Sequence, residues 1–313
     1  GCAGHSVVPS VGGSHVSPFV LQPNGPSPSP WQFFANNATY GSFIVGPDQK
    51  MWTAGGNYMT GYYFDRLDPS TLNVQQFAAP ATINAIAPGS DGNVWWCSNN
   101  GMAGSVTSEG VVTSYVGPGE GCRGMTLGPD GNVWIADVTP MLLRLTPSGT
   151  FTSFAPPHPS CELFAIVGGK NSLVWFTEIC SQPTPGAYVG NLNTTTLVMQ
   201  DWFIKNPPGN RYRRLFTIAS GVDGNAYAAD ALNGALVRVT PLGAVHVFDH
   251  VFGTIATQEN VNTIWGVTAG PSLAGFAVRG HTLQTYAIPP GYNVAQPIIG
   301  PDMNVWFGEG VYV

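Results

Sequence analysis

The chain has 313 residues, of which only 9% are charged, and its formal net charge is −6. Average soluble proteins carry about 25% charged residues. The eleven lysines and arginines form no basic patch large enough to bind a nucleic acid. No apolar run approaches the roughly 18 residues that a transmembrane helix needs. A surface so poor in charge is typical of an exported protein.

Residues 1–30 form a Ser-, Pro- and Gly-rich arm, which we predict to be a tether. Gly1-Cys2-Ala3-Gly4 resembles the end of a bacterial lipoprotein signal, in which the cysteine carries the lipid. Such an anchor at Cys2 is the only membrane contact that we expect. Alternatively, Cys2 forms an intermolecular bridge, and the arm holds subunits together by self-association.

Residues 31–313 contain one turn motif in seven copies. The clearest copy is Gly128-Pro129-Asp130-Gly131-Asn132-Val133-Trp134, and looser copies end at Trp175 and Trp265. The anchoring aromatic residues recur about every 42 residues, at Trp52, Trp95, Trp134, Trp175, Tyr227, Trp265 and Trp306. Repeats of this length fit four-stranded propeller blades. We therefore predict an all-β, seven-bladed β-propeller of four-stranded antiparallel blades.

One repeat shows how a blade forms. Apolar segments at 124–127, 133–135, 142–145 and 150–154 predict four strands. Pro-Asp-Gly-Asn predicts the tight turn between the first two, because Pro presets φ, Asp caps the turn and Gly accepts a positive φ. Neighbouring blades cover both faces of each blade, so we expect the repeated Trp to pack between blades.

The ends of the chain predict how the ring closes. The sequence stops soon after the seventh turn, so the seventh blade lacks its outer strand. The segment 31–34, Trp-Gln-Phe-Phe, resembles a fourth strand and is predicted to pair with the C-terminal strands. Such a closing strand removes an exposed sheet edge.

The repeat Gly-Pro-Asp-Gly-Asn-Val-Trp, followed by Ile-Ala or Phe-Thr-Glu, resembles the streptogramin (virginiamycin B) lyase-like propellers, a group near the NHL-repeat proteins. In the lyase, a His just before an inner strand acts with glutamates that hold Mg²⁺ near the propeller axis. The corresponding positions here hold no His; they are Gly41, Asn84, Arg123, Leu163 or Phe164, Phe216 and Ala295. Only Glu178 and Glu309 remain of the glutamates. We therefore predict no catalytic residue, no metal and no cofactor.

The cysteines predict two disulfides. Cys161 and Cys180 flank the fourth turn, so they face each other across a hairpin. Cys97 ends the second strand of one blade and Cys122 begins the inner strand of the next, on the same rim. The pairs 97–122 and 161–180 would indicate an oxidising compartment. Buried free thiols are the alternative.

The rim that carries the starts of the inner strands is the expected ligand face. The candidate ligand-binding residues there are Arg123, Glu162, Glu178, Arg211, Arg213, Arg214 and Glu309. The arginines could bind a small anion or a sulfated glycan. The alternative is that they pair with Glu162, Glu178 or Asp201. His158 with Glu162 and Glu178 is the best-placed set for metal or acid–base chemistry.

Two Asn-X-Thr sequons begin at Asn37 and Asn193 and matter only if the host glycosylates exported proteins. Taken together, the sequence favours an extracytoplasmic, non-enzymatic propeller that acts as a surface scaffold, a binding module or a self-assembling subunit. The alternative is a lyase or hydrolase that acts on a polar small molecule or glycan at the rim.

Overall fold

The structure of the chain is a computed structural model. It describes residues 19–21, 31–33, 43–57, 59, 61–181, 185–209, 211–268, 272–288 and 294–309. For 19–21, 31–33, 57, 294–296 and 308–309 it describes the backbone only. The regular structure in these ranges is all β, and no helix there is long and apolar enough to span a membrane.

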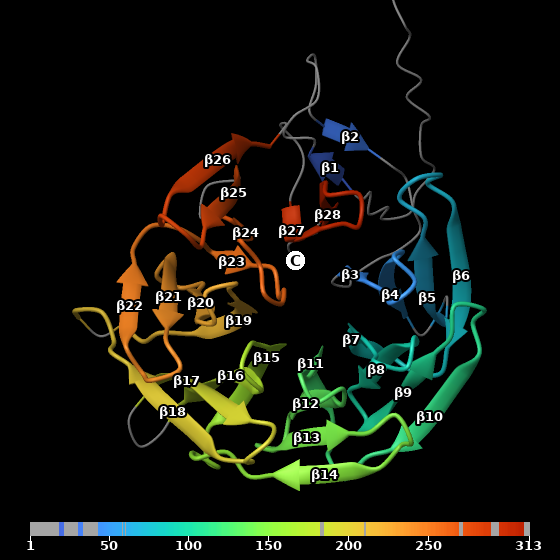
Figure 1. Cartoon of the computed structure of the whole chain (residues 1–313), viewed down its shortest axis with the longest axis horizontal. Helices are drawn as coiled ribbons and strands as arrows, with labels where there is room; N and C mark the ends of the chain where they lie inside the picture. The colour runs from blue at the N-terminus through green and yellow to red at the C-terminus, as the bar shows by residue number, and fades with distance from the viewer. Residues whose placement is uncertain are drawn as a thin grey trace, which may run out of the picture.

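The strands form four-stranded antiparallel sheets that are arranged as a β-propeller around a central axis (Figure 1). The first sheet contains β3 (Ile44–Val45), β4 (Met51–Asn57), β5 (Gly61–Leu67) and β6 (Val74–Ala79). The second contains β7 (Ile83–Pro88), β8 (Val94–Ser98), β9 (Met102–Val106) and β10 (Val112–Val116). The third contains β11 (Cys122–Leu127), β12 (Val133–Asp137), β13 (Leu142–Leu145) and β14 (Phe151–Phe154).

In each of these sheets the first strand in the chain lies nearest the axis and the fourth lies outermost (Figure 1), and the next three sheets follow the same order. The fourth contains β15 (Glu162–Gly168), β16 (Leu173–Cys180), β17 (Gly186–Asn193) and β18 (Met199–Ile204). The fifth contains β19 (Leu215–Ser220), β20 (Ala226–Asp230), β21 (Ala235–Val239) and β22 (Val245–Phe248). The sixth contains β23 (Thr254–Ile255), β24 (Thr263–Val267), β25 (Ser272–Ala277) and β26 (Leu283–Ala287).

The seventh sheet combines both ends of the chain, in the order β2-β1-β28-β27. It contains β27 (Val294–Ile299), β28 (Val305–Glu309), β1 (Phe19–Leu21) and β2 (Trp31–Phe33). The predicted partner of the C-terminal strands was the segment 31–34. Instead, β1 pairs with β28, and β2 pairs with β1 as the outermost strand. Both N-terminal segments are short and apolar, and the sequence alone did not separate their roles.

The turn motif explains why the sheets form. Asp130 Oδ1 accepts hydrogen bonds from the Asn132 backbone N–H at 3.3 Å and from the Trp134 indole N–H at 3.0 Å. A Cβ atom on Gly128 would lie 2.6 Å from the same Oδ1, so only glycine fits beside the indole ring. Gly131 takes a φ of 78°, which favours glycine. The motif thus couples the turn to the position of the buried Trp134.

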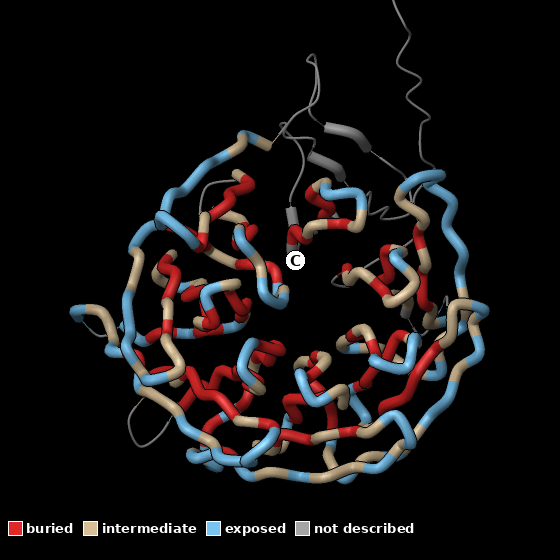
Figure 2. The backbone as a smooth tube through the Cα atoms, viewed as in Figure 1, coloured by how far each residue is buried: buried red, intermediate tan, exposed pale blue. Residues whose placement is uncertain are grey.

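The repeated aromatic residues form the blade-to-blade core, as predicted. All seven anchors are at most 7% exposed, and they lie among the buried positions of the inner and middle strands (Figure 2). The outermost strands are largely exposed or intermediate. The aspartate also bonds the anchor residue in the first, second, fifth and seventh sheets. Trp175 and Trp265, whose copies of the motif lack the aspartate, have buried indole nitrogens without a hydrogen-bond partner.

Both predicted disulfides are present. Cys97 and Cys122 join the second sheet to the third, with their Cα atoms 5.9 Å apart. Cys161 and Cys180 join the start of β15 to the end of β16, with their Cα atoms 4.4 Å apart. These separations lie in the normal range for disulfides. Cys2 and Asn37 lie outside the described residues, as does the predicted arm apart from β1.

Candidate functional site

A β-bulge at the start of the inner strands positions the first group of candidate residues. In β11, Cys122 pairs with Asp137 and Gly124 with Ala136, which leaves Arg123 without a paired residue. The same irregularity leaves Phe216 unpaired in β19 and Asn84 unpaired in β7. In β15 it falls between Leu163 and Ile166. A bulge changes the direction in which the unpaired side chain points.

A central cavity of about 410 Å³ lies between the inner strands. The cavity is lined by the residues at the bulged positions: Asn84, Arg123, Phe164 and Phe216. Leu163, the other residue considered for the fourth position, is fully buried between sheets, so Phe164 is the residue at the cavity. The bulged positions of four consecutive sheets therefore meet around one cavity.

Arg123 and two phenylalanines form one end of this cavity. The Arg123 guanidinium lies 4.4 Å from the centre of the Phe164 ring, and the Phe164 and Phe216 rings are 5.1 Å apart. Arg123 Nη2 donates to Glu162 Oε2 at 2.7 Å, and these side chains are 31% and 55% exposed. Two of the predicted ligand-binding residues are thus adjacent, and the cation is partly open to solvent.

A loop of the sixth sheet forms the other end of the cavity. Glu259 accepts a hydrogen bond from the Thr126 hydroxyl of the third sheet at 2.6 Å. Its side chain has solvent-accessible surface in the cavity that it lines. Partial loss of water around the Glu259 carboxyl raises its pKa, and the Thr126 hydrogen bond partly opposes the shift. Glu259 was not among the predicted site residues, because the sixth copy of the repeat, which contains it, departs from the motif.

The arginine cluster after the long fourth-to-fifth connection is divided between the interior and the surface. Arg213 is 6% exposed, and its guanidinium bonds Asp230 at 2.8 Å and the Lys205 carbonyl oxygen at 2.8 Å. Its partner is therefore Asp230, not Glu162, Glu178 or Asp201 as considered. Arg211 and Arg214 are exposed. Only the backbone of Glu309 is described, at the end of β28.

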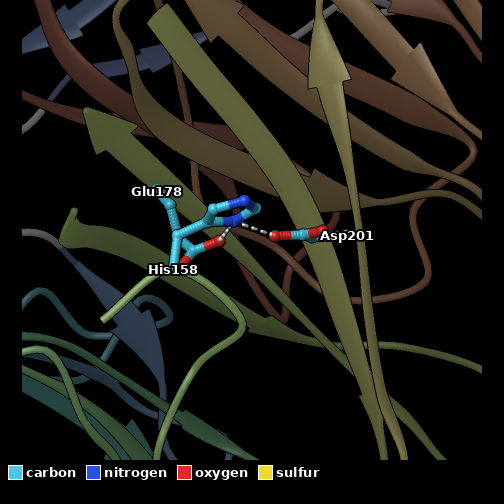
Figure 3. A group of neighbouring side chains, drawn as sticks. All are labelled: His158, Glu178 and Asp201. Atoms are coloured by element: carbon cyan, nitrogen blue, oxygen red, sulfur yellow. Dashed lines mark hydrogen bonds and ion pairs between the residues drawn. The ribbon is translucent and has the colours of Figure 1, made fainter. Parts of the chain in front are cut away.

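A second group of candidate residues lies in the fourth sheet. His158, in the loop before β15, meets Glu178 of β16 and Asp201 of β18 (Figure 3). His158 Nδ1 lies 2.6 Å from Asp201 Oδ2 and 3.7 Å from Glu178 Oε2. Glu162 instead pairs with Arg123, so Asp201 takes the place that we expected for Glu162.

Glu178 is the most unusual member of this group. Its side chain is fully buried, and neither carboxylate oxygen has a hydrogen-bond partner. Burial, together with the neighbouring Asp201 carboxylate, raises the pKa of Glu178 to about 9. None of the three residues lines the central cavity.

The predicted glycosylation residue Asn193 ends β17 and is half-buried. Its side-chain oxygen accepts hydrogen bonds from the backbone N–H groups of Thr195 at 2.9 Å and Thr196 at 3.0 Å. Asn193 therefore caps the turn that leads into β18.

The repeated sheets and the ligand-sized cavity on their axis define a β-propeller with an axial pocket. Residues 33–199 match the virginiamycin B lyase family, which is more than half of the chain. The chain belongs to this family. No curated protein matches it in sequence.

Solved structures support the same fold. A streptogramin B lyase structure is 22% identical, with a TM-score of 0.71, and the match covers 86% of this chain and 92% of that one. Virginiamycin B lyase from Staphylococcus aureus is 17% identical, with a TM-score of 0.66 and coverages of 94% and 87%. A catalytically inactive variant of the S. aureus enzyme with quinupristin gives the same TM-score of 0.66 at 16% identity, with coverages of 94% and 87%. At these identities the likeness shows the fold alone.

Proposed function

We propose that this chain is a non-enzymatic binding module that holds a small aromatic anion in its axial cavity. The observation that carries the proposal is the cluster of Arg123, Phe164 and Phe216 at one end of the cavity. An arginine stacked on an aromatic ring presents a cation beside an apolar surface. This combination suits a ligand with a ring and an acidic group.

The cavity has the size of a small-molecule site. Its volume of about 410 Å³ lies within the roughly 300–1,000 Å³ that is typical of ligand pockets. Glu162 is the present partner of Arg123, but both side chains are partly exposed. Exposed ion pairs contribute only about 0–1 kcal/mol. A ligand anion can therefore replace or join Glu162 at small cost.

The bulged positions favour binding over catalysis. In the lyase that the repeat resembles, one of these positions holds a His that acts in the reaction. Here the bulged positions are occupied by Asn84, Arg123, Phe164 and Phe216. None of these side chains accepts a proton at neutral pH. The alternative is a lyase or hydrolase that acts on a polar small molecule or glycan.

The test uses 1-anilinonaphthalene-8-sulfonate, an aromatic anion, and N-phenyl-1-naphthylamine, which lacks the sulfonate. We expect Arg123→Gln to weaken binding of the anion by about tenfold or more, because a charge-assisted hydrogen bond contributes about 1.5–3 kcal/mol. The neutral probe should be unaffected by Arg123→Gln, and Phe164→Ala should weaken both probes. Arg211→Gln is the matched control on an exposed arginine. Equal affinity of wild type and Arg123→Gln for the anion would refute the binding site.

The enzymatic alternative has its own assay. Quinupristin is incubated with the chain and followed by chromatography. We expect no conversion. Conversion would overturn the non-enzymatic assignment and establish the lyase alternative.

We also propose an extracytoplasmic location and a seven-bladed ring that β1 closes through β28. The two disulfides support the location, because such bonds persist in oxidising compartments. The pairing of β1 with β28 supports the closure. Self-association through the arm and a lipid at Cys2 stay proposals. Self-association is tested by light scattering of the full chain and of a chain without residues 1–18, which keeps β1. The lipid at Cys2 is tested by mass spectrometry of the native protein.

A further inference from the structure

We propose that His158, Glu178 and Asp201 bind one divalent transition-metal ion of the Zn²⁺ type. This site is separate from the axial cavity and does not depend on the proposed ligand. One nitrogen and two carboxylate groups are ligands that such ions accept in proteins. The three candidate ligand atoms all lie within 4.8 Å of one another.

The fold brings these residues together from three elements. Glu178 pairs with Tyr188 across β16 and β17, and Asp201 pairs with Gly190 across β17 and β18. Side chains two residues apart on a strand share a face. Phe176, two residues before Glu178, packs on Trp134 of the third sheet. The two carboxylates therefore lie on the face of the fourth sheet that meets the third, and His158 covers them from the connecting loop.

The buried Glu178 carboxylate is the independent indication of a missing ligand. Its side chain is 0% exposed, points toward His158 (Figure 3), and makes no hydrogen bond through either oxygen. Among the described residues, no lysine or arginine forms an ion pair with Glu178 or Asp201. Buried charges in proteins are normally paired or coordinate metals. Glu178 and Asp201 therefore share His158 as a partner. A divalent cation would balance the negative charges of the two carboxylates.

The distances require only small shifts. Ligand atoms at about 2.0–2.2 Å from a tetrahedral Zn²⁺ lie about 3.3–3.6 Å from one another. The observed distances from His158 Nδ1 are 2.6 Å to Asp201 and 3.7 Å to Glu178, one shorter and one longer than this value. Small side-chain movements would place all three atoms around one ion.

The surroundings hold the ligands in place and leave an entrance. The His158 ring lies 4.1 Å from the Tyr188 ring, and the Cys161 backbone N–H donates to the His158 carbonyl oxygen at 2.9 Å. The disulfide from Cys161 to Cys180 ties this loop to the strand of Glu178. The His158 side chain is 36% exposed, so an ion can enter from solvent on that side. Three protein ligands leave at least one coordination position for water.

Calorimetric titration of the full chain with Zn²⁺ tests the site. Because His5, His15 and Cys2 can also bind zinc, the measured quantity is the difference between wild type and Glu178→Gln. We expect wild type to bind one additional equivalent. We expect the affinity of this equivalent to fall by more than about 100-fold in the variant, since even loss of an outer-shell partner can cost about 10–100-fold. Asp201→Asn is the second variant, in case Glu178→Gln fails to fold by circular dichroism.

Two controls make the result specific. Glu109→Gln removes an exposed carboxylate from the second sheet and should leave zinc binding unchanged. Titration with Co²⁺ should give visible absorption bands in wild type that are missing in both site variants. If the folded site variants bind Zn²⁺ as wild type does, or if the Co²⁺ spectra are identical, the three residues share a proton and not a metal, and the proposal is wrong.

Discussion

At the scale of single residues, the repeated aspartate has two roles. It caps the turn, and in the third sheet it also accepts the indole N–H of Trp134. The sequence predicted the cap from the turn chemistry alone. It did not predict the indole bond, because that bond depends on how the second strand returns past the turn. Trp175 and Trp265 support this link between the aspartate and the indole. Their copies of the motif lack the aspartate, and their indole nitrogens have no hydrogen-bond partner.

We expect Asp130→Ala to destabilise the protein by about 1–3 kcal/mol, because it leaves the buried Trp134 indole N–H without an acceptor and removes the cap. Asp130→Asn retains a side-chain oxygen and should cost less. Urea unfolding provides the measurement, with Asp249→Ala, at an exposed aspartate, as the control. Equal stability of Asp130→Ala and wild type would show that the indole bond contributes nothing.

Glu259 predicts a pH dependence. Its folded-state pKa is raised above the usual value of 4.5 because the loss of water around the carboxyl disfavours its charged form. A group of this kind stabilises the fold fully below its unfolded pKa, and the contribution is lost as the pH rises through the folded pKa. Glu259→Gln should therefore gain stability relative to wild type as the pH increases above about 4.5. Melting temperatures of both proteins across this pH range test the prediction; a constant difference would contradict it.

At the scale of elements, the bulges decide which side chains reach the axis. Spacing along the sequence predicted the position of Arg123 and Phe216 but left Leu163 and Phe164 unresolved. The bulge resolves this choice, because it shifts the register between Leu163 and Ile166. Asp201 was not predicted as a partner of His158, because it lies on an outer strand and approaches Glu178 only diagonally across β17.

The two disulfides should differ in their effects. Each closes a segment with a sequence separation of 25 or 19 residues, so loss of either should cost about 3 kcal/mol by the chain-entropy estimate. Replacing Cys161 and Cys180 by serine should also weaken zinc binding, because their bond positions the His158 loop. Replacing Cys97 and Cys122 should lower stability alone. Chemical unfolding and zinc titration of the two double variants distinguish these outcomes, and equal zinc affinities would remove the positioning role.

At the scale of the whole molecule, the repeat period was sufficient to predict a propeller, because each of the first six copies forms one complete sheet. The identity of the N-terminal strand that pairs with β28 was not predictable. Phe19–Leu21 lies inside the segment that composition marks as a tether, and its pairing depends on distant C-terminal residues.

Deletion of residues 1–34 should therefore lower the melting temperature by about 5 °C or more, because it removes β1 and β2 and exposes the edge of β28. Deletion of residues 1–18 should have little effect on stability, because β1 remains. Calorimetry of both truncated proteins makes the comparison. If they melt together, β1 does not stabilise the ring.

The hydrogen bond from Thr126 to Glu259 spans the axis between the third and sixth sheets. A propeller with an open axis allows a molecule to enter at one face and leave at the other. Here the loop that carries Glu259 connects two sheets that are not neighbours in the ring, and we expect the proposed ligand to enter the cavity beside the partly exposed Arg123. We expect a cavity of about 410 Å³ to hold one such ligand at a time, so slow dissociation of a bound molecule would delay binding of the next.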